Sequence, residues 1–190
     1  MQTGRELMTL RRVIMDKEQM MKERHEVLEA LEGSLQEELI AAKLNTPEEG
    51  NGTEVLTVIF HELGIDGDGA VGELFFLPIV NDEMAVQHFA TVLTIADEIG
   101  EDQYPALYEA ISYINFRLPC GAYALDDESG SLVFKLTVPM PADLSKEDLL
   151  NEMNICSGNA VAAADQYMDL LLRMLDGDTS MDDVRAAFEG

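Results

Sequence analysis

Cysteine is nearly absent from this sequence, and so are the signals of export. Cys120 and Cys156 are the only cysteines among 190 residues, and no CxxC pair or companion histidine pattern accompanies them. Two cysteines in a chain of this size do not indicate a disulfide framework. Residues 1–13 lack the unbroken apolar core of a signal peptide, and no apolar run approaches the roughly 18–20 residues that cross a bilayer. We therefore expect a cytoplasmic protein without membrane contact.

Basic side chains are also scarce. Lysine and arginine number 12 against 37 acidic residues, which gives a formal net charge of −25. Residues 1–44 carry seven basic and nine acidic side chains, whereas residues 45–190 carry five and 28. Such a field repels phosphate backbones, so we expect no nucleic-acid binding. A basic protein partner fits this field, and solubility alone explains it as well.

Catalytic and zinc motifs are missing. The chain has no GxSxG sequence, no Walker-type loop and no dinucleotide fingerprint. His61 and Glu62 begin like a metalloprotease motif, but Ile65 stands where the second histidine belongs. Cys156 lies on the apolar stripe of a predicted helix, where a small buried side chain is the ordinary interpretation. We predict no catalytic residue and no cofactor.

Two short acidic loops are similar to calcium-binding loops. In the first, Asp66 and Asp68 have calcium-like spacing, but Val71 occupies the position that requires glycine. In the second, which begins at Asp176, Met181 occupies that position. Tight turns account for both loops, so we predict no metal site.

The first 44 residues have a seven-residue repeat that predicts a long amphipathic helix. One row of the repeat is apolar and consists of Leu7, Ile14, Met21, Leu28, Leu35 and Ala42. Charged residues interrupt the second row at Lys17, Arg24 and Glu38. A break is conceivable at Gly33-Ser34, because glycine disfavours helix. Residues 45–53, with Pro47 and two glycines, read as a linker.

Residues 54–190 have the pattern of one α+β domain, and 47% hydrophobic residues suffice for its core. Apolar, β-branched runs predict strands at 55–62, 71–80 and 86–96, and two more strands form a hairpin around a turn at 126–130. One helix runs from Pro105 to Pro119, and a longer one begins at Ser145. The predicted order is α-β-β-β-α-β-β-α, with a short helical tail after residue 178.

The second predicted strand is apolar on both faces. Phe75, Leu77 and Ile79 alternate with Leu74 and Phe76. A sheet of this kind needs two covers. We expect the later helices to supply one. The other is either the N-terminal helix or a second subunit, so this helix packs on its own domain or on a partner.

An asparagine, Asn115, ends one predicted helix and precedes a hairpin whose first strand ends in an acidic turn. This segment and others, namely 121–126, Gly130, 132–136, 145–149 and 165–167, lie within roughly residues 54–175. On these segments the domain resembles the YbjN-like family, bacterial proteins of the sensory transduction regulator type, in which an asparagine also closes a helix before such a hairpin. The resemblance implies a type III secretion chaperone-like fold, in which helices flank a twisted antiparallel sheet. It also implies proteins that are often dimeric and hold other proteins without catalysis.

These observations predict a non-enzymatic, protein-binding module with a chaperone-like or regulatory role. We expect it to form a homodimer and to capture a segment of a partner protein on an apolar sheet or helix face. The predicted anchors are the aromatic residues Phe75, Phe76, Phe89, Tyr123 and Phe134. One alternative is an enzyme that uses converging carboxylates, with or without a divalent metal, drawn from Asp66, Asp68, Asp126 and Asp127. A second alternative is a structural oligomerisation module built on the N-terminal helix.

Overall fold

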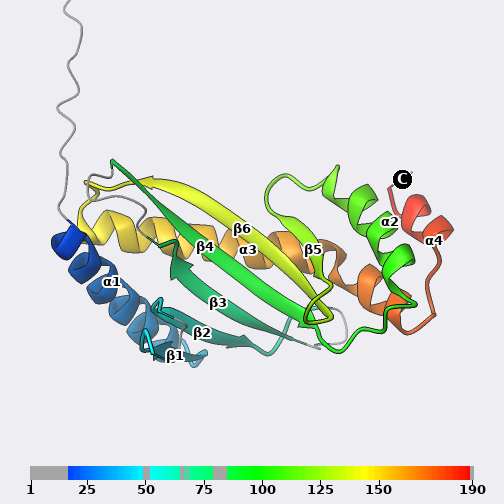
Figure 1. Ribbon diagram of the computed structural model, residues 1–190, viewed down its shortest axis with the longest axis horizontal. Helices are drawn as coiled ribbons and strands as arrows, with labels where there is room; N and C mark the ends of the chain where they lie inside the picture. The colour runs from blue at the N-terminus through cyan, green and yellow to red at the C-terminus, as the bar shows by residue number, and fades with distance from the viewer. Residues whose placement is uncertain (1–16, 49–51, 65–66, 68, 79–84, 189–190) are drawn as a thin grey trace, which may run out of the picture.

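The computed structural model describes residues 17–48, 52–64, 67, 69–78 and 85–188. It confirms the α+β class, with helices packed on a single antiparallel sheet (Figure 1). Residues 1–16, and therefore Leu7 and Ile14 of the predicted heptad row, lie outside this part of the chain. The elements are α1 (Lys17–Glu37), β1 (Ala41–Asn45), β2 (Val55–Phe60), β3 (Ala70–Phe76), β4 (Val86–Ala96), α2 (Tyr104–Asn115), β5 (Ala122–Asp126), β6 (Ser131–Pro141), α3 (Lys146–Leu175) and α4 (Met181–Ala186).

The sheet has six strands in the order β1-β2-β3-β4-β6-β5, and every neighbouring pair is antiparallel. β4 and β6, at 11 residues each, form its long central pair. Strands at 55–60, 70–76 and 86–96 and the β5–β6 hairpin agree with the predicted ones. The fold therefore contains the predicted strands and one more, β1.

β1 corrects the prediction that the N-terminal helix continues to residue 44. The helix ends at Glu37, and the chain reverses at Leu39, whose φ is 64°. Residues 41–45 then pair with β2, so that Ala42 and Leu44 face the core side of the sheet. Pairing satisfies the main-chain groups of this segment, which the heptad pattern alone does not take into account.

The two long helices, α1 and α3, pack on the same face of the sheet. A single apolar cluster joins Val27, Leu28 and Leu31 of α1 to Leu149, Met153 and Cys156 of α3 through Leu56, Leu74, Phe76 and Phe89 of the sheet. The N-terminal helix therefore packs on its own chain. It does not supply the expected second cover, because it shares the first face with α3.

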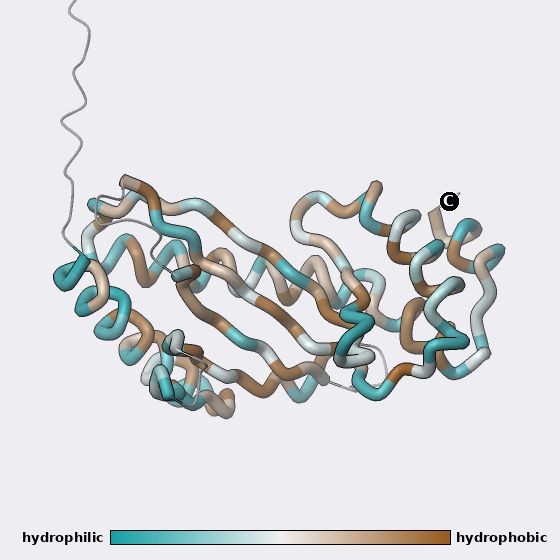
Figure 2. Tube along the Cα trace, viewed as in Figure 1, coloured by the Kyte–Doolittle hydropathy of each residue, from teal (hydrophilic) through white to brown (hydrophobic). Residues whose placement is uncertain are grey.

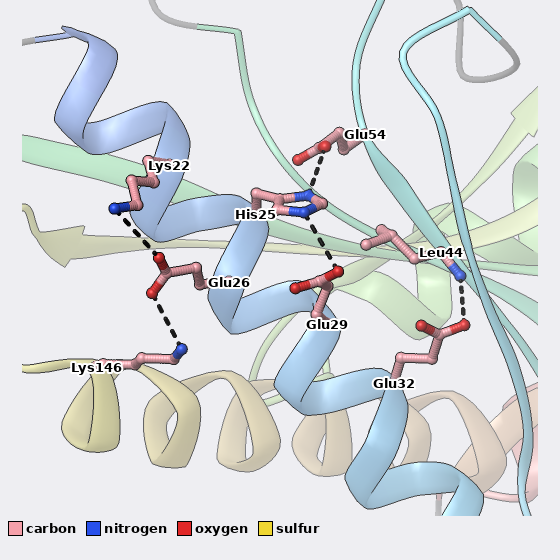
Figure 3. A network of polar contacts seen from close by, with 8 residues as sticks. All are labelled: Lys22, His25, Glu26, Glu29, Glu32, Leu44, Glu54 and Lys146. Atoms are coloured by element: carbon pink, nitrogen blue, oxygen red, sulfur yellow. Dashed lines mark hydrogen bonds and ion pairs between the residues drawn. The ribbon is translucent and has the colours of Figure 1, made fainter.

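Polar contacts also fasten α1 to three different parts of the chain (Figure 3). They are Glu26 to Lys146 Nζ at the start of α3 (3.2 Å), His25 Nδ1 to Glu54 before β2 (2.8 Å), and Glu32 to the main-chain N–H of Leu44 in β1 (2.9 Å). Together with the shared core, these contacts make α1 an integral layer of the fold.

The C-terminal half of the sheet has its own apolar cluster under α2 and the second half of α3. Pro105 lies in the first turn of α2, as predicted. Ser145 caps α3 by accepting a hydrogen bond from the N–H of Asp148 (3.1 Å), and the helix continues through Gly158 without a break. None of the described helices contains a stretch long and apolar enough to cross a membrane.

Candidate protein-binding face

No helix of the described residues lies on the face of the sheet opposite α1 and α3, and we call this the open face. Strand alternation determines its residues: in β3, Leu74 and Phe76 are buried against the helices, so Glu73 and Phe75 point to the other side. Pairing registers extend the assignment to the neighbouring strands. The open face comprises Ala41, Lys43 and Asn45 of β1, Val55, Thr57 and Ile59 of β2, Val71, Glu73 and Phe75 of β3, Val86, His88, Ala90, Val92 and Thr94 of β4, Val133, Lys135, Thr137 and Pro139 of β6, and Ala122, Ala124 and Asp126 of β5.

Large apolar side chains on the open face are unusually accessible. Ile59 is 42% exposed, Val71 44% and Val86 40%. Ile59 and Val71 are direct cross-strand partners, and the row continues from Val71 through Thr94 to Val133. Figure 2 shows hydrophobic stretches along the strands as well as along the helices that cover the opposite face. Ile59 and Val71 thus form an adjoining exposed apolar pair, whereas Val86 lies at the other end of β4. Adjoining exposed apolar side chains are a feature of interaction sites.

The row beside it carries the charge of the open face. Thr57, Glu73, Val92 and Lys135 are cross-strand neighbours in that order. Glu73 and Lys135 thus flank Val92 from strands that lie about 10 Å apart, twice the usual strand spacing. Val92 at the centre of this row is therefore apolar and lies between an acid, Glu73, and a base, Lys135, and a second base, Lys43 of β1, lies beyond Thr57.

A shallow hollow of about 290 Å³ lies at the end of the face where β4 is irregular. Ile59, Val71 and Thr94 form part of its lining, together with His61 and Asp97 from the adjoining loops. The hollow lies between the exposed pair and the β2–β3 connection, and its lining is more polar than apolar.

Of the five predicted anchors, only Phe75 lies on the open face, where it is half-buried. The other four are in the core: Phe76 is 3% exposed, Phe89 1%, Tyr123 2% and Phe134 0%. Their rings form two pairs there, Phe76 with Phe89 at 5.4 Å and Tyr123 with Phe134 at 5.1 Å between centroids. Rings buried in this way do not reach a partner in this conformation.

Sequence reasoning missed the β-branched residues that the open face exposes, above all Ile59 and Val71. A signal for them was present in β3. The alternation that places Leu74 toward the core also places Val71, Glu73 and Phe75 together on the other side. Side-chain size as the criterion for anchors favours aromatic rings, and these are usually buried in the core.

In the described part of the chain, the carboxylates on which the enzyme alternative depends do not converge in a pocket. Asp66 and Asp68 lie outside this part of the chain. Asp126 begins the β5–β6 turn, where a hydrogen bond with the Ser129 hydroxyl, and others from the main chain, hold its pKa below the ordinary value. Asp127 follows it in the exposed turn.

The described residues likewise contain no arrangement of side chains suited to metal binding or to thiol catalysis. No group of three or more His, Cys, Asp or Glu side chains is placed there to hold a metal ion. The second calcium-like loop, from Asp176, contributes to no such group. Burial raises the pKa of the Cys156 thiol, with a smaller effect of Glu152, which works against a nucleophilic thiolate.

Comparison with known proteins gives a likeness in fold. No family model matches the sequence, and no curated protein matches it. The structure is similar to that of YbjN from E. coli, described as a proposed transcription regulator, with 11% identity and a TM-score of 0.43 over 74% of this chain and 89% of that one. It is also similar to an uncharacterised protein from Methanothermobacter thermautotrophicus, with 17% identity and a TM-score of 0.41 over 80% of this chain and 97% of that one.

Proposed function

We propose that this protein is a non-enzymatic protein-binding module with a regulatory or chaperone-like role, which captures a segment of a partner protein on the open face. The observation that carries the proposal is the exposure of Ile59 and Val71, side by side on the face that no helix covers. Burying apolar surface stabilises a complex by roughly 25 cal/mol per Å². A partner that covers this row therefore gains binding energy without a change in the fold.

The chemistry of the open face indicates what the partner segment looks like. Its centre requires apolar side chains opposite Val71 and Val92. The net charge of the whole protein, −25, attracts basic partners and increases the rate at which they associate with it. We infer an apolar segment with lysine or arginine at its flanks.

Self-association is a second candidate, favoured by the row that contains Glu73, Val92 and Lys135. A two-fold axis lying in the interface along β4 exchanges the two flanking strands. Glu73 of each copy then meets Lys135 of the other, while Val92 meets Val92. Such self-complementarity is what a two-fold interface requires. The net charge opposes this candidate, because two copies of −25 repel each other.

Substitutions that introduce positive charge on the open face test the proposal. The double variant Ile59→Lys, Val71→Lys alters exposed positions, so we expect it to fold as the wild type does. Affinity capture from cells of the source organism should recover a partner with the wild type and lose it with the double variant. Ile155→Lys, at a 48% exposed apolar position of α3, is the control for a lysine placed on another surface.

The outcomes separate the candidates. Loss of the partner with the double variant alone supports the proposal. A wild-type dimer in sedimentation that the double variant dissociates supports self-association. Equal recovery from the double variant and from Ile155→Lys overturns the assignment to the open face.

A further inference from the structure

Arg24 is a buried cation that has no counter-ion among the described residues. It projects from α1, is only 5% exposed, and lies with its guanidinium carbon 4.8 Å from the centroid of the Phe76 ring. Nε donates to Oε1 of Gln87 (3.1 Å), and Nη1 donates to the carbonyl of Leu77 (3.0 Å). Nη2 is buried and has no hydrogen-bond partner. One nitrogen of this side chain therefore remains unsatisfied.

This arrangement lowers the stability of the fold, although the sequence contains many acidic residues that could pair with Arg24. Leaving a buried donor unpaired costs about 1–3 kcal/mol, and more when the group is charged. Desolvation lowers the pKa of Arg24 to about 10, so the guanidinium is still protonated at neutral pH. Acidic residues number 37, yet none of those in the described ranges pairs with Arg24. An unpaired buried group of this kind calls for a ligand or a functional explanation.

A pocket of about 270 Å³ lies against Arg24, between α1, the segment before β2 and the end of β3. It is on the covered side of the sheet, because Leu28 and Phe76 belong to the core beneath α1. Its apolar lining is Met21, Leu28, Phe76 and Pro78, and its polar lining is Lys17, Arg24, Thr53 and Glu54, with Gly52 at one edge. Since a water molecule takes about 30 Å³, the pocket holds a group of roughly nine non-hydrogen atoms.

The lining restricts the ligand to a narrow chemical class. Because Nε and Nη1 each have a partner, Nη2 is the nitrogen without one, and its two N–H groups suit a carboxylate better than a phosphate, which takes more donors. Glu54 at the rim, held by His25 at 2.8 Å, disfavours a second negative charge on the ligand. Met21, Leu28 and Phe76 favour an alkyl or aryl body.

We propose that this pocket binds a small monocarboxylate with an apolar body, whose carboxylate accepts a hydrogen bond from Nη2 of Arg24. Lys17 at the rim adds a second positive charge on the ligand's path. Nη2 is closed to bulk water in the free protein, so binding includes a shift of the outer wall. Met21 lines the pocket, is 44% exposed and has an unbranched, flexible side chain that can move in this way. The site is separate from the open face and does not depend on its function.

Hexanoate and its neutral isostere hexanamide test this site directly on the full chain. Isothermal titration at low salt should give saturable one-to-one binding of hexanoate, and at least tenfold weaker binding of hexanamide, because only the carboxylate compensates Arg24. Benzoate and benzamide repeat the comparison with an aryl body. Equal affinity for acid and amide, or absence of binding by both hexanoate and benzoate, overturns the proposal.

Amino-acid substitutions test whether hexanoate binds in this pocket. Arg24→Met removes the charge but also breaks two internal hydrogen bonds, so its fold is at risk. Met21→Glu changes an exposed residue and places a negative charge on the pocket wall, and it should weaken hexanoate at least tenfold while thermal unfolding stays as in the wild type. Gln19→Glu, exposed on the same helix outside the pocket, makes the same charge change and should bind as the wild type does. Equal binding by the two glutamate variants also overturns the proposal.

Discussion

Asn115, the last residue of α2, holds both main-chain polar groups of Tyr123 in β5. Its Nδ2 donates to the carbonyl of Tyr123 (2.9 Å), and its Oδ1 accepts from the Tyr123 N–H (2.8 Å). β5 is an outer strand of the sheet, so groups on its free side have no sheet partner. One side chain thus completes the edge strand and fixes α2 against it.

Replacing Asn115 with alanine should therefore lower the free energy of unfolding by about 1–3 kcal/mol, because it leaves both groups of Tyr123 without their protein partner. Asn115→Asp keeps the acceptor and removes the donor, and should lose less. Urea unfolding at neutral pH measures both. An Asn115→Ala protein as stable as the wild type would contradict this account of the hairpin.

Gly121 should tolerate no side chain. Its φ is +67°, and an added Cβ would lie 2.4 Å from Cζ of the buried Phe134 ring. Gly121→Ala should lower the free energy of unfolding by about 2–4 kcal/mol, from backbone strain and overpacking together. Gly158→Ala is the control, since its Cβ meets nothing within 4 Å in the interior of α3. That substitution should stabilise by about 0.5–1 kcal/mol, and a loss at both positions would refute the distinction.

The contact between α1 and α3 should weaken in acid. A hydrogen bond from Lys146, and then its charge, lowers the pKa of Glu26. A carboxyl whose pKa is lower in the folded state stabilises the fold above its unfolded pKa, near 4.5 here, and loses this effect as the pH falls through the folded value. Glu26→Gln should thus be less stable than the wild type at about pH 6, and the difference should shrink toward about pH 3.

Urea unfolding at the two pH values, in the wild-type and Lys146→Met backgrounds, measures this coupling. In the Lys146→Met background, Glu26→Gln should have little further effect at either pH. An equal effect of Glu26→Gln at both pH values would show that the carboxylate charge is not what stabilises the contact.

Local patterns predicted most elements because these elements depend on near neighbours. Ser145 caps α3 through Asp148, three residues on, and the hairpin turn at 126–130 uses the small polar residues and glycine that such turns require. The stripe through Gly158 continues because a single glycine costs a long packed helix only about 1 kcal/mol.

Features that depend on distant partners were not predictable in the same way. β1 continues the heptad phase of α1 in sequence, and only its pairing with β2 makes it a strand. The apolar stripe of α1 indicates that the helix packs, but it does not say on which face of the sheet. Arg24 reads as a charge interrupting the heptad seam, and its burial depends on Phe76 and Gln87, more than 50 residues away.

The residues of the candidate site were likewise predictable only as far as local patterns determine them. Alternation in β3 predicted correctly that Phe75 points away from Leu74 and Phe76. Which of the two sides remains uncovered depends on where α1 and α3 pack, and no local pattern carries that information. The exposed row at Ile59 and Val71 therefore emerged only from the structure.

Site-specific photo-cross-linking from Val71 tests the central claim most directly. A photoreactive amino acid at Val71, activated in cells of the source organism, should give a discrete adduct with another protein, and the same residue at Ile155 on α3 should not give it. Adducts between two copies of this chain would instead favour self-association. No adduct at Val71, or the same adducts from both positions, would contradict the proposal that the open face binds a partner protein.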